Sequence, residues 1–419
     1  MREPGKGLTL HFEFCILNSK YRDPWGLSRK KAEREEVRLN EPNWRTRNPE
    51  GTLRVVVTKV LPGEDWLEVL VRAGCRVDIG RSESVLDAGE IEGVIGERCD
   101  GCIGQLTEPW GPRLFEALAR AGGRAYSNYA VGYNNVDLEA ATKHRIPVGN
   151  TPGVLTETTA EMAVALTFAV ARRVVEGDRF MREGRFSGWL PSLLLGELLW
   201  RKTVGIVGAG RIGAAYARMM AEGHKMDVIY HDLRPNGELE DAVAAYGALL
   251  AAEGRRPVTC RRAASLEDLL READVVSLHT VLDADTRHMI DRERLDLMKE
   301  NAVLVNSSRG PLIDEAALVA HCREHPSFRA GLDVFEEEPA MAPGLADLPN
   351  VVVVPHIGSA TRWTREAMAV LAASNVAGLL RGLPVWGRSD MRPFLGPNPP
   401  GAVPSVVNAE PLGLPLFSG

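Results

Sequence analysis

Three residues in the second half of the chain follow β-branched runs and carry side chains that could act on one substrate. Arg309 ends VNSSRG, Glu338 lies in GLDVFEEEP, and His356 follows VVVVP. A guanidinium fork matches a carboxylate, an imidazole can protonate a developing alkoxide, and a carboxylate can orient that imidazole. Together the three motifs predict a site that binds a ketoacid and reduces it.

Two of these residues also have a structural alternative. Glu338 could be one of a solvated acidic run, and Arg309 could be a partner in a structural ion pair. His356 differs from the other histidines because it follows a proline at the predicted carboxyl end of a strand, where open α/β sheets bind ligands. The histidines in helical or irregular polar surroundings are expected to be solvated: His11, His144, His224, His321 and His325.

A glycine-rich turn precedes these motifs. Gly208, Gly210 and Gly213 have the GxGxxG spacing directly after the apolar run VGIV. Such glycines permit a tight turn and close approach of a pyrophosphate to a helix N-terminus. Asp232 ends the next predicted strand and could accept hydrogen bonds from an adenosine ribose, which favours NAD over NADP. The nearby Arg234 weakens that preference, and a glycine turn without ligand remains the alternative.

Short β-branched runs alternate with helical patterns, which predicts an α/β fold with two doubly wound parallel sheets. The first series of strands is expected at 53–60, 76–79, 101–105, 124–128 and 146–150. The second starts at 203–208 and continues through DVIYHD, DVVSLH, AVLVNSS, RAGLDV and NVVVVPHI. The expected domains are an irregular extension (1–51), the first part of a substrate-binding domain (52–157), a Rossmann domain (158–357), a return helix (358–390) and an extended tail (391–419).

Composition excludes some classes of partner. The formal charge of −6 and the pI near 5.9 give no general attraction to nucleic acid or to acidic membranes, so neither partner is expected. The apolar stretch 162–171 is too short to span a bilayer and predicts a buried helix. Of six cysteines only Cys99 and Cys102 form a CxxC pair, which lacks the further ligands of a zinc site. We assign that pair no function and predict no metal site.

Several longer motifs together resemble one known family. The chain from Leu53 to Leu416 is similar to the D-isomer-specific 2-hydroxyacid dehydrogenases, in particular to the NADH-dependent hydroxypyruvate reductases of plants and green algae. The segments that carry the resemblance are GQLTEPWG, AVGYNNVDL, VGNTPGVLTETTAE, GWLP, GAGRIGAAYARMMAEG, SSRGPLIDEAAL, GLDVFEEEP and HIGSATRWTRE. The set is far more specific than any one motif.

The resemblance implies roles for the catalytic and substrate-binding residues. Arg309 would bind the substrate carboxylate and carbonyl, His356 would act as acid and base, and Glu338 would pair with it. Backbone N–H groups of Val131 and Gly132 would help to hold the carboxylate.

Further contacts are implied with the cofactor and with a second subunit. The NAD contacts would be Arg211 and Ile212 at the phosphates, Asp232 at the ribose, and Thr280, Ser307 and Asp333 near the nicotinamide. Trp189 would reach into the neighbouring subunit's site, so a homodimer is implied. The alternative for Trp189 is a side chain packed within its own loop.

The implied reaction is reduction of hydroxypyruvate to D-glycerate by NADH, and of glyoxylate to glycolate less efficiently, as in photorespiratory metabolism. The alternatives are a reductase of another small 2-ketoacid, such as a glyoxylate reductase or D-lactate dehydrogenase, and an NAD-sensing binding protein similar to the related corepressors. Plant members often end in Ser-Lys-Leu, whereas this chain ends Phe417, Ser418, Gly419. Mitochondrion or cytoplasm is therefore favoured over the peroxisome.

Overall fold

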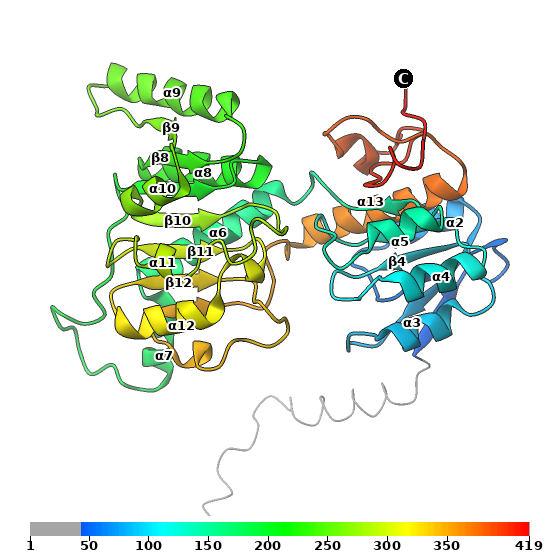
Figure 1. The fold of residues 1–419 in the computed structure, drawn as a ribbon, viewed down its shortest axis with the longest axis horizontal. Coiled ribbons are helices and arrows are strands. Elements are labelled where there is room, and N and C mark those ends of the chain that lie inside the picture. Colours follow the sequence, from blue (N-terminus) through cyan, green and yellow to red (C-terminus); the bar gives the residue numbers. More distant parts are fainter. Residues whose placement is uncertain (1–42, 419) are drawn as a thin grey trace, which may run out of the picture. The chain divides into compact units, whose positions relative to one another are not determined.

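The computed structural model describes residues 43–418, which form two β-sheets (Figure 1). The six-stranded sheet has the order β1 (Trp44–Arg47), β3 (Cys75–Gly80), β2 (Leu53–Val57), β4 (Gly101–Gly104), β5 (Ala125–Asn128), β6 (Val148–Gly149). The seven-stranded sheet has the order β13 (Val351–Val353), β12 (Arg329–Leu332), β11 (Val303–Asn306), β10 (Val275–Leu278), β7 (Thr203–Val207), β8 (Asp227–His231), β9 (Cys260–Arg262).

Parallel pairing runs from β2 to β6 and from β7 to β13, which confirms the predicted α/β fold class. The helices of the six-stranded unit are α2 (Asp65–Arg72), α3 (Ala88–Ile95), α4 (Pro112–Arg120), α5 (Leu138–Lys143), α13 (Arg362–Leu380) and the 3-10 turn η3 (Arg392–Leu395). Those of the seven-stranded unit are α6 (Thr156–Ala171), α7 (Val174–Arg182), α8 (Arg211–His224), α9 (Gly237–Ala252), α10 (Leu266–Glu272), α11 (Arg292–Leu295), α12 (Glu315–Glu324), η1 (Gly310–Leu312) and η2 (Leu345–Asp347). The predicted domain boundaries stay predictions.

Sheets covered by helices need strands that are apolar on both faces, and the sequence supplies them. Val55, Val56 and Val57 in β2 are fully buried. Helix α13 returns to this sheet from the end of the chain, where Ala369 and Ala373 are fully buried and let the helix lie close to the strands. This helix lies within the return helix predicted at 358–390. No helix among residues 43–418 is both long and apolar enough to span a membrane.

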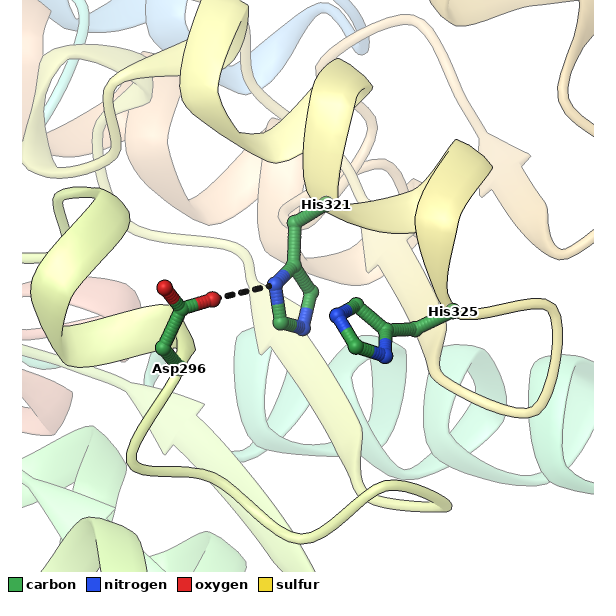
Figure 2. Close-up of side chains that lie close together, drawn as sticks. All are labelled: Asp296, His321 and His325. Atoms are coloured by element: carbon green, nitrogen blue, oxygen red, sulfur yellow. Dashed lines mark hydrogen bonds and ion pairs between the residues drawn. The ribbon is translucent and has the colours of Figure 1, made fainter.

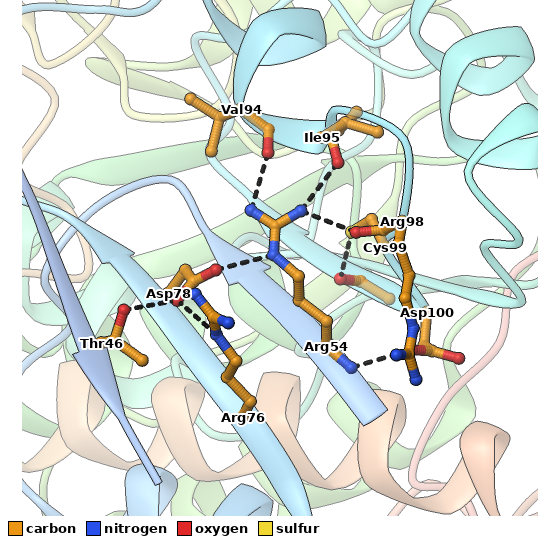
Figure 3. Close-up of polar contacts among 10 residues, drawn as sticks. Thr46, Arg54, Arg76, Asp78, Val94, Ile95, Arg98, Cys99 and Asp100 are labelled. Atoms are coloured by element: carbon orange, nitrogen blue, oxygen red, sulfur yellow. Dashed lines mark hydrogen bonds and ion pairs between the residues drawn. The ribbon is translucent and has the colours of Figure 1, made fainter. Parts of the chain in front are cut away.

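A polar network holds the outer edge of the six-stranded sheet (Figure 3). Arg54 in β2 donates to Asp78 in β3 at 2.7 Å and to the carbonyls of Val94 and Ile95, where α3 ends, at 2.9 and 2.8 Å. Thr46 in β1 donates to Asp78 at 2.7 Å. Burial alone would raise the pKa of Asp78, but the hydrogen bonds from Arg54 and Thr46 hold it below its ordinary value. The prediction that residues 1–51 are irregular is therefore wrong for β1, because a partner distant in sequence supports that strand. Residues 1–42 lie outside the described part.

Two other segments are more ordered than expected. Strand β9 extends the edge of β8 within a stretch where no strand was predicted. The tail, expected as extended chain on the surface, includes η3 and buries Phe394 and Val403. Its Asn408 is buried and accepts a hydrogen bond from the N–H of Val148 at 2.8 Å. The tail is part of the packing of the first sheet, because its apolar and amide side chains are complementary to β6 and α13.

Candidate active site

The glycine turn connects β7 to α8, and two of its glycines are required by packing. Gly208 has φ +91°, and a Cβ there would lie 2.7 Å from the backbone nitrogen of Thr280. A Cβ on Gly213 would lie 2.1 Å from the carbonyl oxygen of Gly208. A Cβ on Gly210 would meet nothing within 4 Å, so packing does not explain this glycine. The open space lies at the N-terminus of α8, where a pyrophosphate could approach the backbone.

Asp232 follows β8 and is fixed beside this turn. Its carboxylate accepts hydrogen bonds from the N–H of Ala209 at 2.8 Å and of Arg234 at 3.2 Å. Each oxygen retains acceptor capacity for a ribose hydroxyl. Arg262 in β9 donates to the carbonyl oxygens of Asp232 at 2.7 Å and Leu233 at 3.1 Å. Sequence reasoning missed Arg262 because it predicted no strand there.

His356 and Glu338 form the predicted pair. Nδ1 of His356 lies 2.9 Å from Oε2 of Glu338, whose Oε1 accepts the N–H of Phe335 at 3.1 Å. Burial raises the pKa of Glu338, but the hydrogen bond and charge of His356 outweigh it and lower the pKa overall. The backbone of His356 is left-handed, with φ 51°, and its N–H donates to Asp333 O at 2.9 Å. Glu338 is thus engaged with the imidazole and is not a solvated member of an acidic run.

Arg309 is held by hydrogen bonds from Nε and Nη1, and Nη2 has no hydrogen-bond partner within residues 43–418. Nε donates to Oδ1 of Asn134 at 3.1 Å, and Nη1 donates to Ser308 O at 2.6 Å. Nη2 lies against Gly132, where any Cβ would be only 1.6 Å away. Burial lowers the pKa of Arg309 from its high ordinary value. Asn134 was missed by sequence reasoning, since nothing local marks it as a partner of Arg309.

One cavity of about 190 Å³ gathers most of the predicted residues. Those that line it are Val131, Gly132, Ile212, Thr280, Ser307, Arg309, Asp333 and His356. Gly210 and Arg211 line a second hollow of about 640 Å³, together with residues of the C-terminal tail. Trp189 is 80% exposed.

Two polar groups in the first cavity bear on ligand binding. The hydroxyl of Ser307 is buried and has no hydrogen-bond partner among the described residues, so a ligand hydroxyl or amide could satisfy it. Asp333 accepts the N–H groups of Ile357 at 2.6 Å and Gly358 at 2.7 Å. Burial raises the pKa of Asp333, partly offset by those bonds. Its carboxylate therefore fixes the backbone that follows His356.

His279 also lines this cavity and was missed. Its Nε2 lies 2.9 Å from the hydroxyl of Ser277, and its ring lies against Tyr216 with centroids 5.2 Å apart. Burial lowers its pKa to about 3, so the imidazole is neutral at physiological pH. It can accept or donate a hydrogen bond there but cannot supply a second positive charge.

The expectation that the remaining histidines are solvated is wrong for His321, which is only 4% exposed and bonded to Asp296. His224 is half-buried against Phe168, with ring centroids 4.3 Å apart. Both sit on helices whose buried faces the local polar sequence did not reveal. His11 lies outside the described residues.

The CxxC pair is buried, and burial raises the pKa of Cys99 to about 11 and holds that of Cys102 well above its ordinary value. Thiols with raised pKa values are poor nucleophiles and poor metal ligands at neutral pH. The geometry gives no reason to assign the pair a function.

Comparison with known proteins identifies relatives over most of the chain. Residues 164–358 match the family described as D-isomer specific 2-hydroxyacid dehydrogenase, NAD binding domain. A protein of Arabidopsis thaliana named "Glycerate dehydrogenase HPR, peroxisomal" is 59% identical over 373 residues, 88% of this chain and 97% of that protein. A glyoxylate reductase of Korarchaeum cryptofilum is 41% identical, covering 78% of this chain and 93% of that protein. The crystal structure of the TT0316 protein of Thermus thermophilus has a TM-score of 0.69 at 41% identity, covering 79% and 97% of the two chains.

These relatives overturn the expected localisation. The sequence favoured mitochondrion or cytoplasm over the peroxisome, whereas the 59% identical plant protein is named as peroxisomal. The expectation is wrong; it gave weight to the last three residues and to an N-terminal extension that is unlike that of the plant members. A terminal address is recognised by a receptor and has no bearing on the fold, which the two proteins share.

Proposed function

We propose that this chain, which belongs to the D-isomer-specific 2-hydroxyacid dehydrogenase family, reduces hydroxypyruvate to D-glycerate with NADH. The observation that carries the proposal is one cavity that Arg309 and His356 both line. A small 2-ketoacid has a carboxylate for the first group and a carbonyl oxygen for the second.

The residues of this chain perform binding and proton transfer. When bound, NADH supplies the hydride that adds to C2 of the substrate. Nη2 of Arg309, fixed by the contacts of Nε and Nη1, binds the carboxylate together with the N–H groups of Val131 and Gly132. His356 protonates the oxygen on C2 through Nε2, since Nδ1 is engaged by Glu338. Glu338 orients the imidazole and stabilises its protonated form.

The residues present fit a dinucleotide. Gly210 leaves room for a pyrophosphate at the start of α8, and Arg211 and Ile212 follow it. Asp232 offers acceptors to the ribose hydroxyls, while Thr280, the unpartnered Ser307 hydroxyl and Asp333 surround the space for the nicotinamide end. These contacts together support NAD as the cofactor.

Preference for NADH over NADPH rests on Asp232, since a 2′-phosphate would meet a like charge there. Asp232→Ala should lower the ratio of the specificity constant for NADH to that for NADPH. Arg234 and Arg262 are the cations beside that position. Removing either of them from Asp232→Ala should restore part of the preference for NADH over NADPH. The size of this effect should decrease with added salt. An unchanged ratio in Asp232→Ala would show that Asp232 does not face the ribose.

A homodimer is supported by an apolar surface. Helix α7 has no buried residue, and the segment after it exposes Trp189, Leu190, Leu195 and Leu198 by 56% to 80%. Exposed apolar side chains grouped in this way mark protein interfaces. We propose that a second copy covers them and that Trp189 enters the partner's cavity.

Complementation tests this arrangement. A dimer of His356→Ala with Trp189→Ser has one site with both residues intact only if Trp189 acts in trans. Mixing the two inactive or weakened variants, after dissociation and reassociation, should therefore restore activity. A mixture no more active than its components would place Trp189 in its own chain's site. Sedimentation equilibrium measures the dimer directly.

A substrate panel tests the reaction itself. Purified protein with NADH should consume hydroxypyruvate with a higher specificity constant than glyoxylate or pyruvate, measured by loss of absorbance. The relatives named glycerate dehydrogenase support hydroxypyruvate, and the more distant glyoxylate reductases support glyoxylate as the secondary substrate. A higher specificity constant for glyoxylate would favour a glyoxylate reductase. NAD binding without turnover of any ketoacid would favour an NAD-sensing binding protein.

A further inference from the structure

Three metal-ligating side chains meet away from the cavity, at one end of α12. Asp296 follows α11, His321 lies in the last turn of α12, and His325 comes directly after that helix. One ligand atom from each lies within 4.8 Å of the other two. Figure 2 shows the His321 ring between the Asp296 carboxylate and the His325 ring. Within residues 43–418 this is the one such group, and none of its members lines the cavity of His356.

The spacing explains why the two imidazoles face the same space. Residues four apart on a helix lie on one face, so His321 and His325 are neighbours with ring centroids 4.3 Å apart. His321 is additionally fixed by the ring of Phe328, edge-on at 4.7 Å, and by Asp296, whose Oδ1 lies 3.2 Å from its Nδ1. His321 is thus buried between its neighbours, whereas His325 is half-buried and Asp296 is exposed.

We propose that Asp296, His321 and His325 bind one Zn²⁺ ion, with solvent as the fourth ligand. Two imidazoles and a carboxylate are ligands that zinc accepts, whereas magnesium and calcium prefer sites made of oxygen atoms. Ligand atoms about 2.1 Å from a tetrahedral ion lie roughly 3.4 Å apart, so a small inward movement of the part-exposed side chains completes the site.

A neighbouring cation limits the affinity. Arg292 donates from Nε to Oδ2 of Asp296 at 3.1 Å and from Nη2 to Glu324 at 2.5 Å. A metal ion would replace the hydrogen bond between Oδ1 of Asp296 and Nδ1 of His321, and the guanidinium lowers the negative potential around that oxygen. Replacing Arg292 by glutamine should tighten zinc binding, whereas a purely structural hydrogen bond between His321 and Asp296 predicts no zinc binding at all.

Zinc titration of the chelator-treated full chain tests the proposal. Calorimetry with Zn²⁺ should give one equivalent per wild-type chain, and His325→Gln should weaken its binding by at least about tenfold. His144→Gln is the matched control, since it removes another half-buried histidine outside the cluster, and it should bind zinc as the wild type does. His356→Ala should also retain the binding, which separates this site from the cavity.

Two further measurements use the metal ion alone as the probe. Co²⁺ in the site should give the visible absorption of a tetrahedral ion without a thiolate charge-transfer band, and His325→Gln should lose it. Zinc should raise the melting temperature of the wild type by a few degrees, and that of His325→Gln less. The proposal is overturned if the wild type binds no stoichiometric zinc, or if His325→Gln binds it as tightly as the wild type.

Discussion

Two of the histidine–carboxylate pairs within residues 43–418 have similar Nδ1–oxygen distances and different surroundings. Nδ1 of His356 lies 2.9 Å from Glu338, and Nδ1 of His321 lies 3.2 Å from Asp296. His356 follows a strand in a left-handed conformation and lines a cavity together with Arg309. His321 lies on a helix with its ring buried against aromatic and imidazole neighbours. A hydrogen-bonded pair thus does not define a function, because what faces the other ring nitrogen decides the available chemistry.

The largest contrast between the pairs should appear in turnover. General acid catalysis typically contributes about a hundred- to ten-thousand-fold, so His356→Ala should lower kcat by that order while NADH binding changes little. His321→Asn should leave kcat within a few-fold of the wild type. Steady-state kinetics and NADH fluorescence titration measure both quantities. Near-normal turnover in His356→Ala would remove this residue from the mechanism.

Arg309 lines the cavity of His356, whereas His321 and Asp296 do not. Arg309→Lys keeps the charge but loses the fork that Asn134 and Ser308 hold, so kcat/KM for hydroxypyruvate should fall about ten- to a hundred-fold, with a higher KM. Wild-type kinetics in that variant would mean that another residue binds the carboxylate.

The contact of Arg309 with Gly132 provides a test that leaves the arginine unchanged. Gly132→Ala should impair the same step, because its methyl group would occupy the position of Nη2. Gly93→Ala is the control, since a Cβ at that glycine in α3 meets nothing within 4 Å.

The next largest contrast is between the effects of removing the carboxylate of each pair. Glu338→Gln removes the anion that stabilises the protonated imidazole, and a hydrogen bond to a charged group contributes about 1.5–3 kcal/mol, so kcat should fall about ten- to a hundred-fold. The rate should also begin to decline at a lower pH than in the wild type. Asp296→Asn should leave the pH–rate profile unchanged. Identical profiles for wild type and Glu338→Gln would contradict the pairing.

The smallest effect concerns stability in mild acid. Burial holds the pKa of folded His321 below its ordinary 6.5, so the unfolded chain takes up that proton first as the pH falls. The contribution of neutral His321 to the free energy of unfolding is fully present above about pH 6.5. It is lost as the pH falls toward the pKa of His321 in the folded chain. Metal-free His321→Asn should therefore lose less unfolding free energy between pH 7.5 and 5.5 than the wild type, measured by urea denaturation.

Glu338 is the control for this measurement of the unfolding free energy, because its pKa is lowered on folding and lies outside the pH interval. Its folded pKa is lowered, so it stays ionised in both states over that interval and its contribution is lost only in stronger acid. Glu338→Gln should therefore not flatten this pH dependence of the unfolding free energy. An equal flattening in both variants would mean that overall charge, and not the buried imidazole, controls the slope.

The sequence by itself determined the features that depend on neighbouring residues. β-branched runs predict buried parallel strands, and the GxGxxG spacing predicts a turn in which Gly208 and Gly213 have no room for a side chain. The positions of Arg309 and His356 also follow locally, because each comes just after a strand and carboxyl ends of parallel strands meet at one edge of a sheet.

Tertiary structure decided the contacts between distant parts of the chain. Asn134 holds Arg309 from 175 positions away, and Arg262 reaches Asp232 across 30 positions through a strand that no local pattern predicted. His321 appears solvated in a polar helix until α11 and the loop at Phe328 cover it. Such contacts depend on which surfaces the fold brings together, and a side chain's burial and pKa are properties of that surrounding space. One chain can therefore carry two similar pairs whose separate chemistry only the folded molecule distinguishes.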